Sequence, residues 1–112
     1  MNKTDGRRPI GCALVIHNKP GATHWITLGA EAARRFGLEP GDRVVTHYDA
    51  EKRQVRLKKT MSPKNGYRLT LINGLRRNIK IACAKFIEGL PCEHLTRIAL
   101  RKEGRYIYGE HE

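Results

Sequence analysis

The second half of this 112-residue chain loosely repeats the first half. Apolar residues and glycines of the two halves align at an offset of 53 residues: Ile16 with Leu69, Gly21 with Gly74, Ile26 with Ile79 and Leu28 with Ile81. A repeat constrains the fold strongly, because each copy is too small to bury its apolar face alone and needs its neighbour. Two copies in one chain therefore predict a molecule with approximate two-fold symmetry.

The alignment continues with a slightly shorter offset toward the end of each copy. Gly37-Leu38 aligns with Gly89-Leu90, Val44 comes near Leu95, and Val55-x-Leu57 comes near Tyr106-x-Tyr108. We expect tandem repeats at about residues 11–59 and 67–109, a linker at residues 60–66 and a flexible basic arm at residues 1–9. Both copies belong to one domain, since a unit of about 45 residues rarely supports a core of its own.

Alternating apolar residues predict a mainly β fold with short helices. Expected strands cover residues 12–17, 25–28, 43–48, 54–59, 68–72, 78–81, 95–101 and 105–108, and short helices cover residues 30–36 and 84–88. The side chains expected to face inward are apolar and alternate along these strands: Ile16, Ile26, Leu28, Val44, Val55, Leu57, Leu69, Leu71, Ile79, Ile81, Leu95 and Ile98. We expect Tyr106 and Tyr108 to lie in the core or at an interface.

The charge of the chain indicates a polyanionic partner. There are 22 Lys and Arg against 11 Asp and Glu, which gives a formal net charge of +11 that both halves share. Such an excess in a small domain favours nucleic acid. Three cysteines without a C-x-x-C pair argue against a disulfide framework and for a reducing compartment. Since no apolar run of about 18 residues and no signal-peptide pattern is present, we expect a cytoplasmic protein without a membrane segment.

One stretch of the first half carries a family resemblance. Its residues are Ile26-Thr27-Leu28, then Ala33-Arg34-Arg35-Phe36-Gly37-Leu38-Glu39-Pro40-Gly41-Asp42-Arg43-Val44, then Val55-Arg56-Leu57-Lys58-Lys59. This pattern, over about residues 11–59, resembles the AbrB/MazE/SpoVT group of swapped-hairpin DNA-binding domains. The second half matches in outline, with Cys92-Glu93 in place of Gly-Asp, and Gly29 and Ala82 stand where the family often has proline. The resemblance implies a swapped-hairpin β-barrel that binds DNA, formed here as a single-chain pseudo-dimer.

Two arginines in a turn are the strongest candidate contacts to nucleic acid. Arg76 and Arg77 follow the turn pair Asn73-Gly74, and arginine makes bidentate contacts with guanine and phosphate. The full set of candidates is basic and lies on turns, strands, helices or the N-terminal arm: Arg76, Arg77, Lys80, Arg34, Lys85, Lys19, His24, Lys64, Arg7 and Arg8. The resemblance implies a DNA-contacting helix arginine at Arg34. The other interpretation of these charges is a solvated face.

We therefore expect a double-stranded DNA-binding protein, a transcriptional regulator of the AbrB-like type, that acts as a monomeric pseudo-dimer or as a homodimer. One alternative is a small protein-binding module, either antitoxin-like or an inhibitor of a larger enzyme, for which Trp25 on the non-core face is an anchor. Another role for this tryptophan is stacking on a base, and a third is closing the end of the barrel. The tyrosines suggest RNA or single-strand binding as a second alternative. The sequence shows no catalytic constellation, cofactor motif or metal-ligand spacing, so we expect no enzyme.

Overall fold

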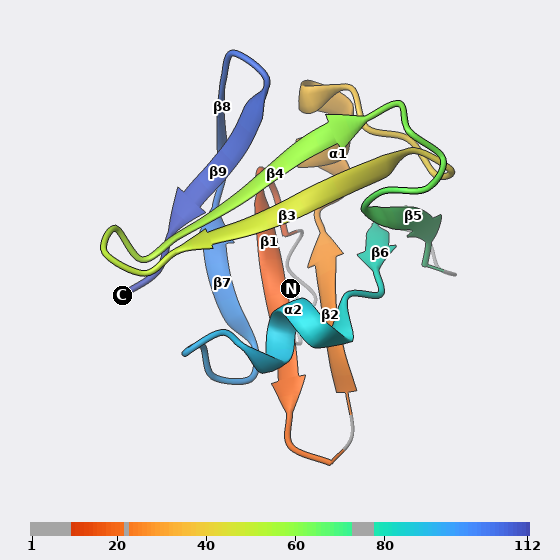
Figure 1. The fold of residues 1–112 in the computed structure, drawn as a ribbon. Helices are drawn as coiled ribbons and strands as arrows, with labels where there is room; N and C mark the ends of the chain where they lie inside the picture. Colours follow the sequence, from red (N-terminus) through yellow and green to blue (C-terminus); the bar gives the residue numbers. More distant parts are fainter. Residues whose placement is uncertain (1–9, 22, 73–77) are drawn as a thin grey trace, which may run out of the picture.

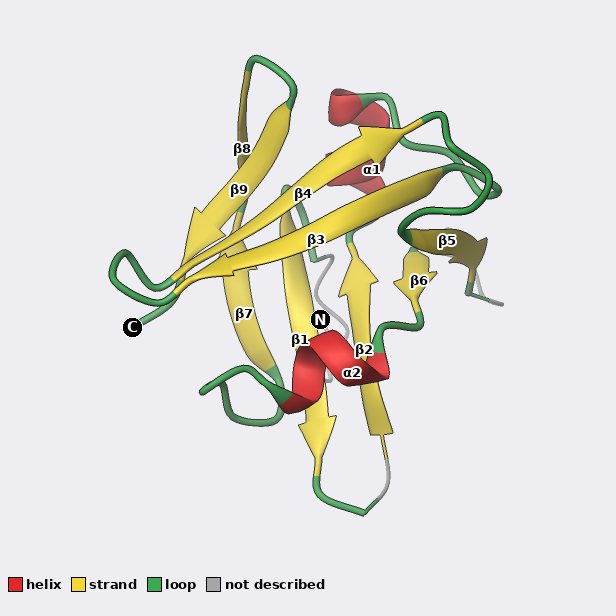
Figure 2. Cartoon of the chain, viewed as in Figure 1, coloured by secondary structure: helices red, strands yellow, loops and turns green. Residues whose placement is uncertain are grey.

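The structure, a computed structural model, describes residues 10–21, 23–72 and 78–112. Within these residues the chain forms nine strands and two short helices, shown in Figures 1 and 2. They are β1 (Ala13–Lys19), β2 (Thr23–Leu28), α1 (Ala30–Phe36), β3 (Arg43–Asp49), β4 (Gln54–Thr60), β5 (Tyr67–Leu71), β6 (Ile79–Ile81), α2 (Ala84–Glu88), β7 (Thr96–Ala99), β8 (Arg101–Glu103) and β9 (Tyr106–Glu110). The prediction of a mainly β fold with short helices is confirmed, and both helices have the expected bounds.

Local sequence explains how α1 begins and ends. Three alanines and two arginines favour a helix, and Ala32, Ala33 and Phe36 form its buried side. The helix ends at Gly37, whose φ of 71° is left-handed, a conformation that only glycine adopts without strain. The N–H of Leu38 then donates to the carbonyl of Ala33 at 2.8 Å, so the last turn is closed as in a Schellman motif.

All nine strands belong to one antiparallel sheet with the order β7-β1-β2-β6-β5-β3-β4-β9-β8. The two strands at the ends of this order, β7 and β8, are consecutive in the chain and are separated by Leu100 alone. Figure 1 shows β7 running directly upward into β8. The sheet therefore curls into a nearly closed barrel, because one bent stretch of chain pairs with β1 at its beginning and with β9 at its end.

The pairing pattern is unchanged when the two halves of the chain are exchanged. The hairpin β1–β2 corresponds to β5–β6, β3 corresponds to the β7–β8 stretch, and β4 corresponds to β9. Strand β1 pairs with β7, and its counterpart β5 pairs with β3. Each first hairpin thus pairs with the third strand of the other half. This is a swapped-hairpin barrel made by one chain, as the fold prediction stated.

The approximate two-fold axis meets the sheet at two residue pairs. In an antiparallel pair of equivalent strands, the axis passes where a residue faces its own counterpart. Thr27 faces Lys80 between β2 and β6, and these positions differ by the repeat offset of 53. Arg56 faces Tyr108 between β4 and β9. The two pairs lie on opposite sides of the barrel, since β5 and β3 separate them in one direction and β1 and the β7–β8 stretch separate them in the other.

The core follows the predicted alternation with two exceptions. Ten of the twelve expected inward side chains are at most 2% exposed: Ile16, Ile26, Leu28, Val44, Val55, Leu57, Leu69, Ile79, Ile81 and Ile98. The prediction was wrong for Leu71 and Leu95, which are 47% and 57% exposed. Leu71 is the last residue of β5, where the strand leaves the sheet. Leu95 has a positive φ of 65° just before β7, which takes it out of the alternation.

The predicted register between the halves was also wrong in two places, at Val44 and in the last strand. Val44 pairs with Tyr67 and Ile98 pairs with Leu14, so the counterpart of Val44 is Ile98, not Leu95. The second half is longer in this region, since Val44 follows the end of α1 at Phe36 by eight residues and Ile98 follows the end of α2 at Glu88 by ten.

In the last strand, Ile107 is 1% exposed while Tyr106 is 47% exposed. The tyrosines are therefore outside the core. The predicted alignment of Val55-x-Leu57 with Tyr106-x-Tyr108 is off by one residue, and a shift of one residue moves every side chain to the other face. Two boundaries change as well. Thr60 belongs to β4 and not to the linker, and the last strand, β9, extends to Glu110 instead of ending at residue 108.

Candidate nucleic-acid interface

Five neighbouring strands form a surface without carboxylates, which we call the cationic face. It is the outer side of β7, β1, β2, β6 and β5. These strands contain no Asp or Glu, and they carry Lys19, Arg68, Lys80 and Arg97. Arg97, Val15, Thr27, Lys80 and Thr70 follow one another across the strands in register. A basic side chain thus stands at the two-fold axis of the barrel.

Trp25 lies at the centre of the cationic face. The ring of His17 on β1 stacks on its indole with centroids 4.7 Å apart, and Nζ of Lys80 on β6 is 4.3 Å from the indole centroid. Since β1 and β6 flank β2 on opposite sides, the two faces of the indole are covered. Trp25 therefore offers no free ring for stacking on a base, and it does not close the end of the barrel. It holds the ammonium group of Lys80 by a cation–π contact.

A shared hydroxyl links the aromatic rings of this centre. The indole Nε1 of Trp25 donates to Oγ1 of Thr27 at 3.2 Å, and Nε2 of His17 lies 2.7 Å from the same oxygen. The ring of His94 approaches His17 edge-on with centroids 6.0 Å apart. Burial is the largest cause that lowers the pKa of His17, and the electrostatic effects of nearby His94 and Lys80 lower it further. The neutral ring is therefore the favoured form near pH 7.

The structure brings three of the predicted contact residues onto this face or its rim. Lys80 lies at the centre, and Lys19 and His24 lie near the end of the β1–β2 hairpin. Nδ1 of His24 is 3.0 Å from Oδ1 of Asn18, which fixes the orientation of the imidazole.

The other described candidates lie on surrounding elements. Arg34 is exposed on α1 and lines an open depression with Leu71 and Ile79. Lys85 is exposed on α2, which packs against β1 and β2, and Lys64 is exposed in the β4–β5 connection. The remaining predicted contacts, Arg76, Arg77, Arg7 and Arg8, lie outside the described residues.

Two exposed arginines of this face, Arg68 and Arg97, are not among the contacts predicted from the sequence. Each directly precedes a core residue of its strand, so strand alternation alone was a sufficient signal for their outward direction. Arg97 also has a structural role, because its Nη2 donates to the carbonyl of Ile10 at 2.8 Å. Its counterpart Arg43 donates to the carbonyls of Asn65 and Gly66 at 2.9 and 3.0 Å. Both arginines thus fasten the segment that leads into a first hairpin.

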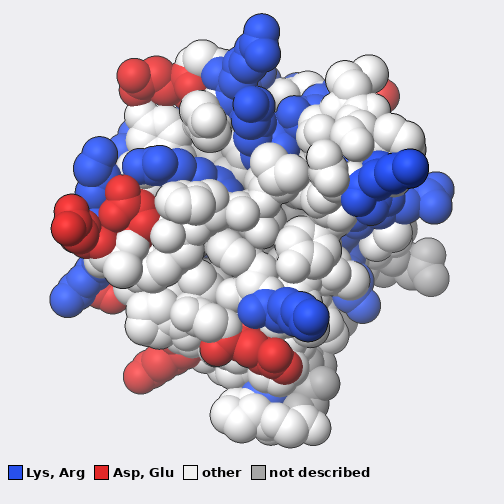
Figure 3. All heavy atoms as spheres, in the orientation of Figure 1, with Lys and Arg blue, Asp and Glu red and all other residues white. Residues whose placement is uncertain are grey.

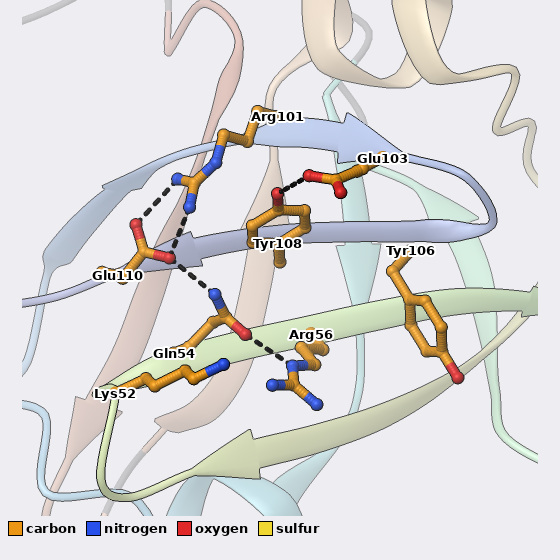
Figure 4. A pocket seen from close by; sticks show the side chains of 8 residues that line it. All are labelled: Lys52, Gln54, Arg56, Arg101, Glu103, Tyr106, Tyr108 and Glu110. Atoms are coloured by element: carbon orange, nitrogen blue, oxygen red, sulfur yellow. Dashed lines mark hydrogen bonds and ion pairs between the residues drawn. The ribbon is translucent and has the colours of Figure 1, made fainter.

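The opposite side of the barrel, the outer side of β4, β9 and β8, differs in its electrostatics. We call it the compensated face. An open depression of about 710 Å³ lies on this face. The residues that line it are Lys52, Gln54, Arg56, Arg101, Glu103, Tyr106, Tyr108 and Glu110. Figure 4 shows how the Arg101 guanidinium reaches both carboxylate oxygens of Glu110, each at 2.7 Å. Hydrogen bonds from Arg101 and Gln54 lower the pKa of Glu110 to about 2.

A second cation of the compensated face, Arg56, is also paired with a carboxylate. Nη2 of Arg56 is 3.1 Å from a carboxylate oxygen of Asp49, and the hydroxyl of Tyr108 donates to Glu103. Figure 3, seen from the side of β3, β4 and α2, shows positive and negative groups interspersed around an uncharged centre. The two ends of the pseudo-two-fold axis therefore differ: one has cations on strands without acids, and the other pairs Arg56 and Arg101 with carboxylates.

Comparison of the chain with known protein families, with curated proteins and with solved structures found no match. In the part of the chain that the structure describes, no helix is long and apolar enough to cross a membrane. Those same residues include no group of three His, Cys, Asp or Glu that could hold a metal ion. Burial raises the pKa of the Cys83 thiol to about 12, which keeps it protonated and unreactive.

Proposed function

We propose that this protein binds double-stranded DNA through the cationic face and acts as a transcriptional regulator. The observation that carries the proposal is the contrast between the two faces. The strands of the cationic face hold four cations and no carboxylate. On the compensated face, Asp49 holds Arg56 and Glu110 holds Arg101. A phosphate backbone is attracted to unneutralised cations and gains little from cations already paired.

The placement of Lys80 supports a duplex as the partner. A duplex has its own approximate two-fold axes, and a protein with two-fold symmetry binds by aligning its axis with one of them. The residues on either side of Lys80 differ between the halves, however. His17 corresponds to Thr70, and Trp25 corresponds to Asn78 at the offset of 53. The preferred site is therefore an imperfect palindrome.

The test is the salt dependence of binding to a random-sequence duplex, measured by fluorescence anisotropy. We expect a steep fall of affinity with salt, because each neutralised phosphate contributes a slope of about 0.9. Lys80→Gln and Arg68→Gln should each weaken binding and lower the slope by about one contact. The matched control is Lys102→Gln, which removes the same charge from exposed Lys102 on β8.

Two outcomes would contradict the proposal. One is an affinity that does not change with salt. The other is an equal loss of affinity in Lys102→Gln and Lys80→Gln, which would indicate attraction by net charge alone. Competition with single-stranded DNA and structured RNA tests the alternative of single-strand binding in the same assay.

A second candidate is a protein-binding module that uses the compensated face. Tyr106 is 47% exposed there, and the Arg101 guanidinium lies 4.2 Å from the ring centroid of Tyr108. Tyrosine and arginine dominate the residues that contribute most to protein interfaces. This candidate predicts one stoichiometric protein partner that survives nuclease treatment and is lost in Tyr106→Ala. Retention of that partner by Tyr106→Ala would exclude the face.

A further inference from the structure

We propose that the cluster of His17, His94 and Lys80 around Trp25 makes binding at the cationic face proton-linked: His17 takes up a proton when the polyanion docks. The affinity then rises as the pH falls. This inference rests on the proposed function and adds a regulatory property to the same site. The cluster draws on β1, β2, β6 and the segment before β7, and its centre is next to the Thr27–Lys80 pair at the two-fold axis.

The hydrogen bonds of Thr27 allow His17 to change its charge without moving. The indole N–H of Trp25 can only donate, so it occupies one lone pair of Oγ1 of Thr27. In the neutral tautomer that carries its proton on Nδ1, Nε2 of His17 can accept from the Thr27 hydroxyl, 2.7 Å away. After protonation Nε2–H donates to the second lone pair of the same oxygen, and the hydroxyl hydrogen rotates away. The protonated ring also remains stacked on the indole.

The groups around His17 favour proton uptake only when an anion is present. On β6 the facing charge is Lys80, and the segment before β7 contributes His94. On β2 the neighbours Trp25 and Thr27 are uncharged, and β1 itself adds Lys19 at its end. Strands β1, β2, β6 and β7 have no carboxylate. A phosphate held by Lys80 would supply the missing negative charge.

The sign of the effect follows from the two states of the ring. Burial, followed by His94 and Lys80, lowers the pKa of His17 in the free protein. Phosphates near Lys80 raise that pKa in the complex, so binding takes up a proton between the two values. Affinity therefore increases as the pH falls from the higher pKa of the complex to the lower pKa of the free protein, by at most tenfold per pH unit and proton. Without the polyanion the lowered pKa has the opposite consequence, since the unfolded chain then binds more protons and acid lowers stability.

The experiment is duplex binding by the full chain from pH 5.5 to pH 8 at constant ionic strength. We expect wild type to bind about three- to tenfold more tightly at pH 5.5 than at pH 7.5, and His17→Gln to lose most of this difference. The matched control is His47→Gln. His47 is exposed on β3, outside the cluster, and its removal should leave the pH dependence intact. Titration of the His17 ring by NMR is the second measurement, with a higher pKa expected after duplex addition.

Each outcome decides the inference. Tight binding without pH dependence, or a pH dependence that survives in His17→Gln, would overturn it and leave the proposed function standing. An unchanged pKa of the wild-type His17 ring on duplex addition would also overturn it, even if His17→Gln failed to fold. Absence of duplex binding at every pH would overturn the proposed function together with the inference.

Discussion

At the scale of single residues, the last strand shows how much depends on which side chain faces inward. The sequence Tyr106-Ile107-Tyr108 alternates, but alternation alone does not say which set is buried. Pairing of Leu57 with Ile107 places the isoleucine in the core and both tyrosines outside. The phenol of Tyr108 then packs under Arg101 on the compensated face.

This assignment predicts effects of very different size for two neighbouring substitutions. Ile107→Ala should lower the free energy of unfolding by about 2–5 kcal/mol, because it leaves a cavity in a packed core. Tyr106→Ala should cost well under half as much, since Tyr106 is 47% exposed. Urea unfolding followed by circular dichroism measures both values. A larger loss in Tyr106→Ala would show that the register of β9 is wrong.

At the scale of elements, the barrel closes where β9 passes close to the end of β7. A Cβ added to Gly109 would lie 2.2 Å from the carbonyl oxygen of Ala99 and 2.6 Å from Cγ2 of Ile98. No side chain fits in that space. The tight crossing explains why a glycine interrupts the alternation of β9, although glycine normally weakens a strand.

Gly109→Ala should therefore destabilise the protein by about 1–3 kcal/mol or more, the usual cost of overpacking. The control is Gly89→Ala after α2. A Cβ at Gly89 would have no neighbour closer than 3.7 Å, so its effect should be small. Thermal unfolding of the two variants gives the comparison. Equal midpoints would mean that β7 and β9 separate more easily than the structure indicates.

At the scale of the whole molecule, the two halves depend on each other for their sheet. The hairpin β1–β2 continues onto β7 of the second half, and β5 pairs with β3 of the first half. Each half also contributes one of the two strands at each end of the two-fold axis. Folding therefore requires pairings between residues far apart in the sequence, which makes loop closure costly and folding slow.

Interlacing predicts the behaviour of a divided chain. A cut after residue 62 falls in the β4–β5 connection next to Met61, which is 89% exposed. Neither fragment should form a stable sheet alone, because each lacks the strand that its first hairpin pairs with. An equimolar mixture should recover the β signal in circular dichroism and show a cooperative thermal transition. A sharp transition in either fragment alone would contradict the swapped arrangement.

The candidate site shows the same division between local and non-local information. Lys80 was recognisable as an outward cation between Ile79 and Ile81, because strand alternation is local. Its contact with Trp25 depends on the pairing of β2 with β6, and the approach of His94 to His17 depends on where the chain runs before β7. These contacts join segments that local patterns do not relate, so sequence analysis identified individual residues and not the cluster.

The amino-acid sequence by itself determined the alternation of the strands, the two short helices, the repeat of the halves and the absence of acids from five strands. Each of these is set by neighbouring residues or by composition. The tertiary structure alone decided that Ile98 and not Leu95 is the counterpart of Val44, and that Ile107 and not its tyrosine neighbours enters the core. It also decided which rings surround Lys80. The physical reason is that register depends on connection lengths and on pairing between distant strands, and a shift of one residue exchanges the inside of a barrel for its outside.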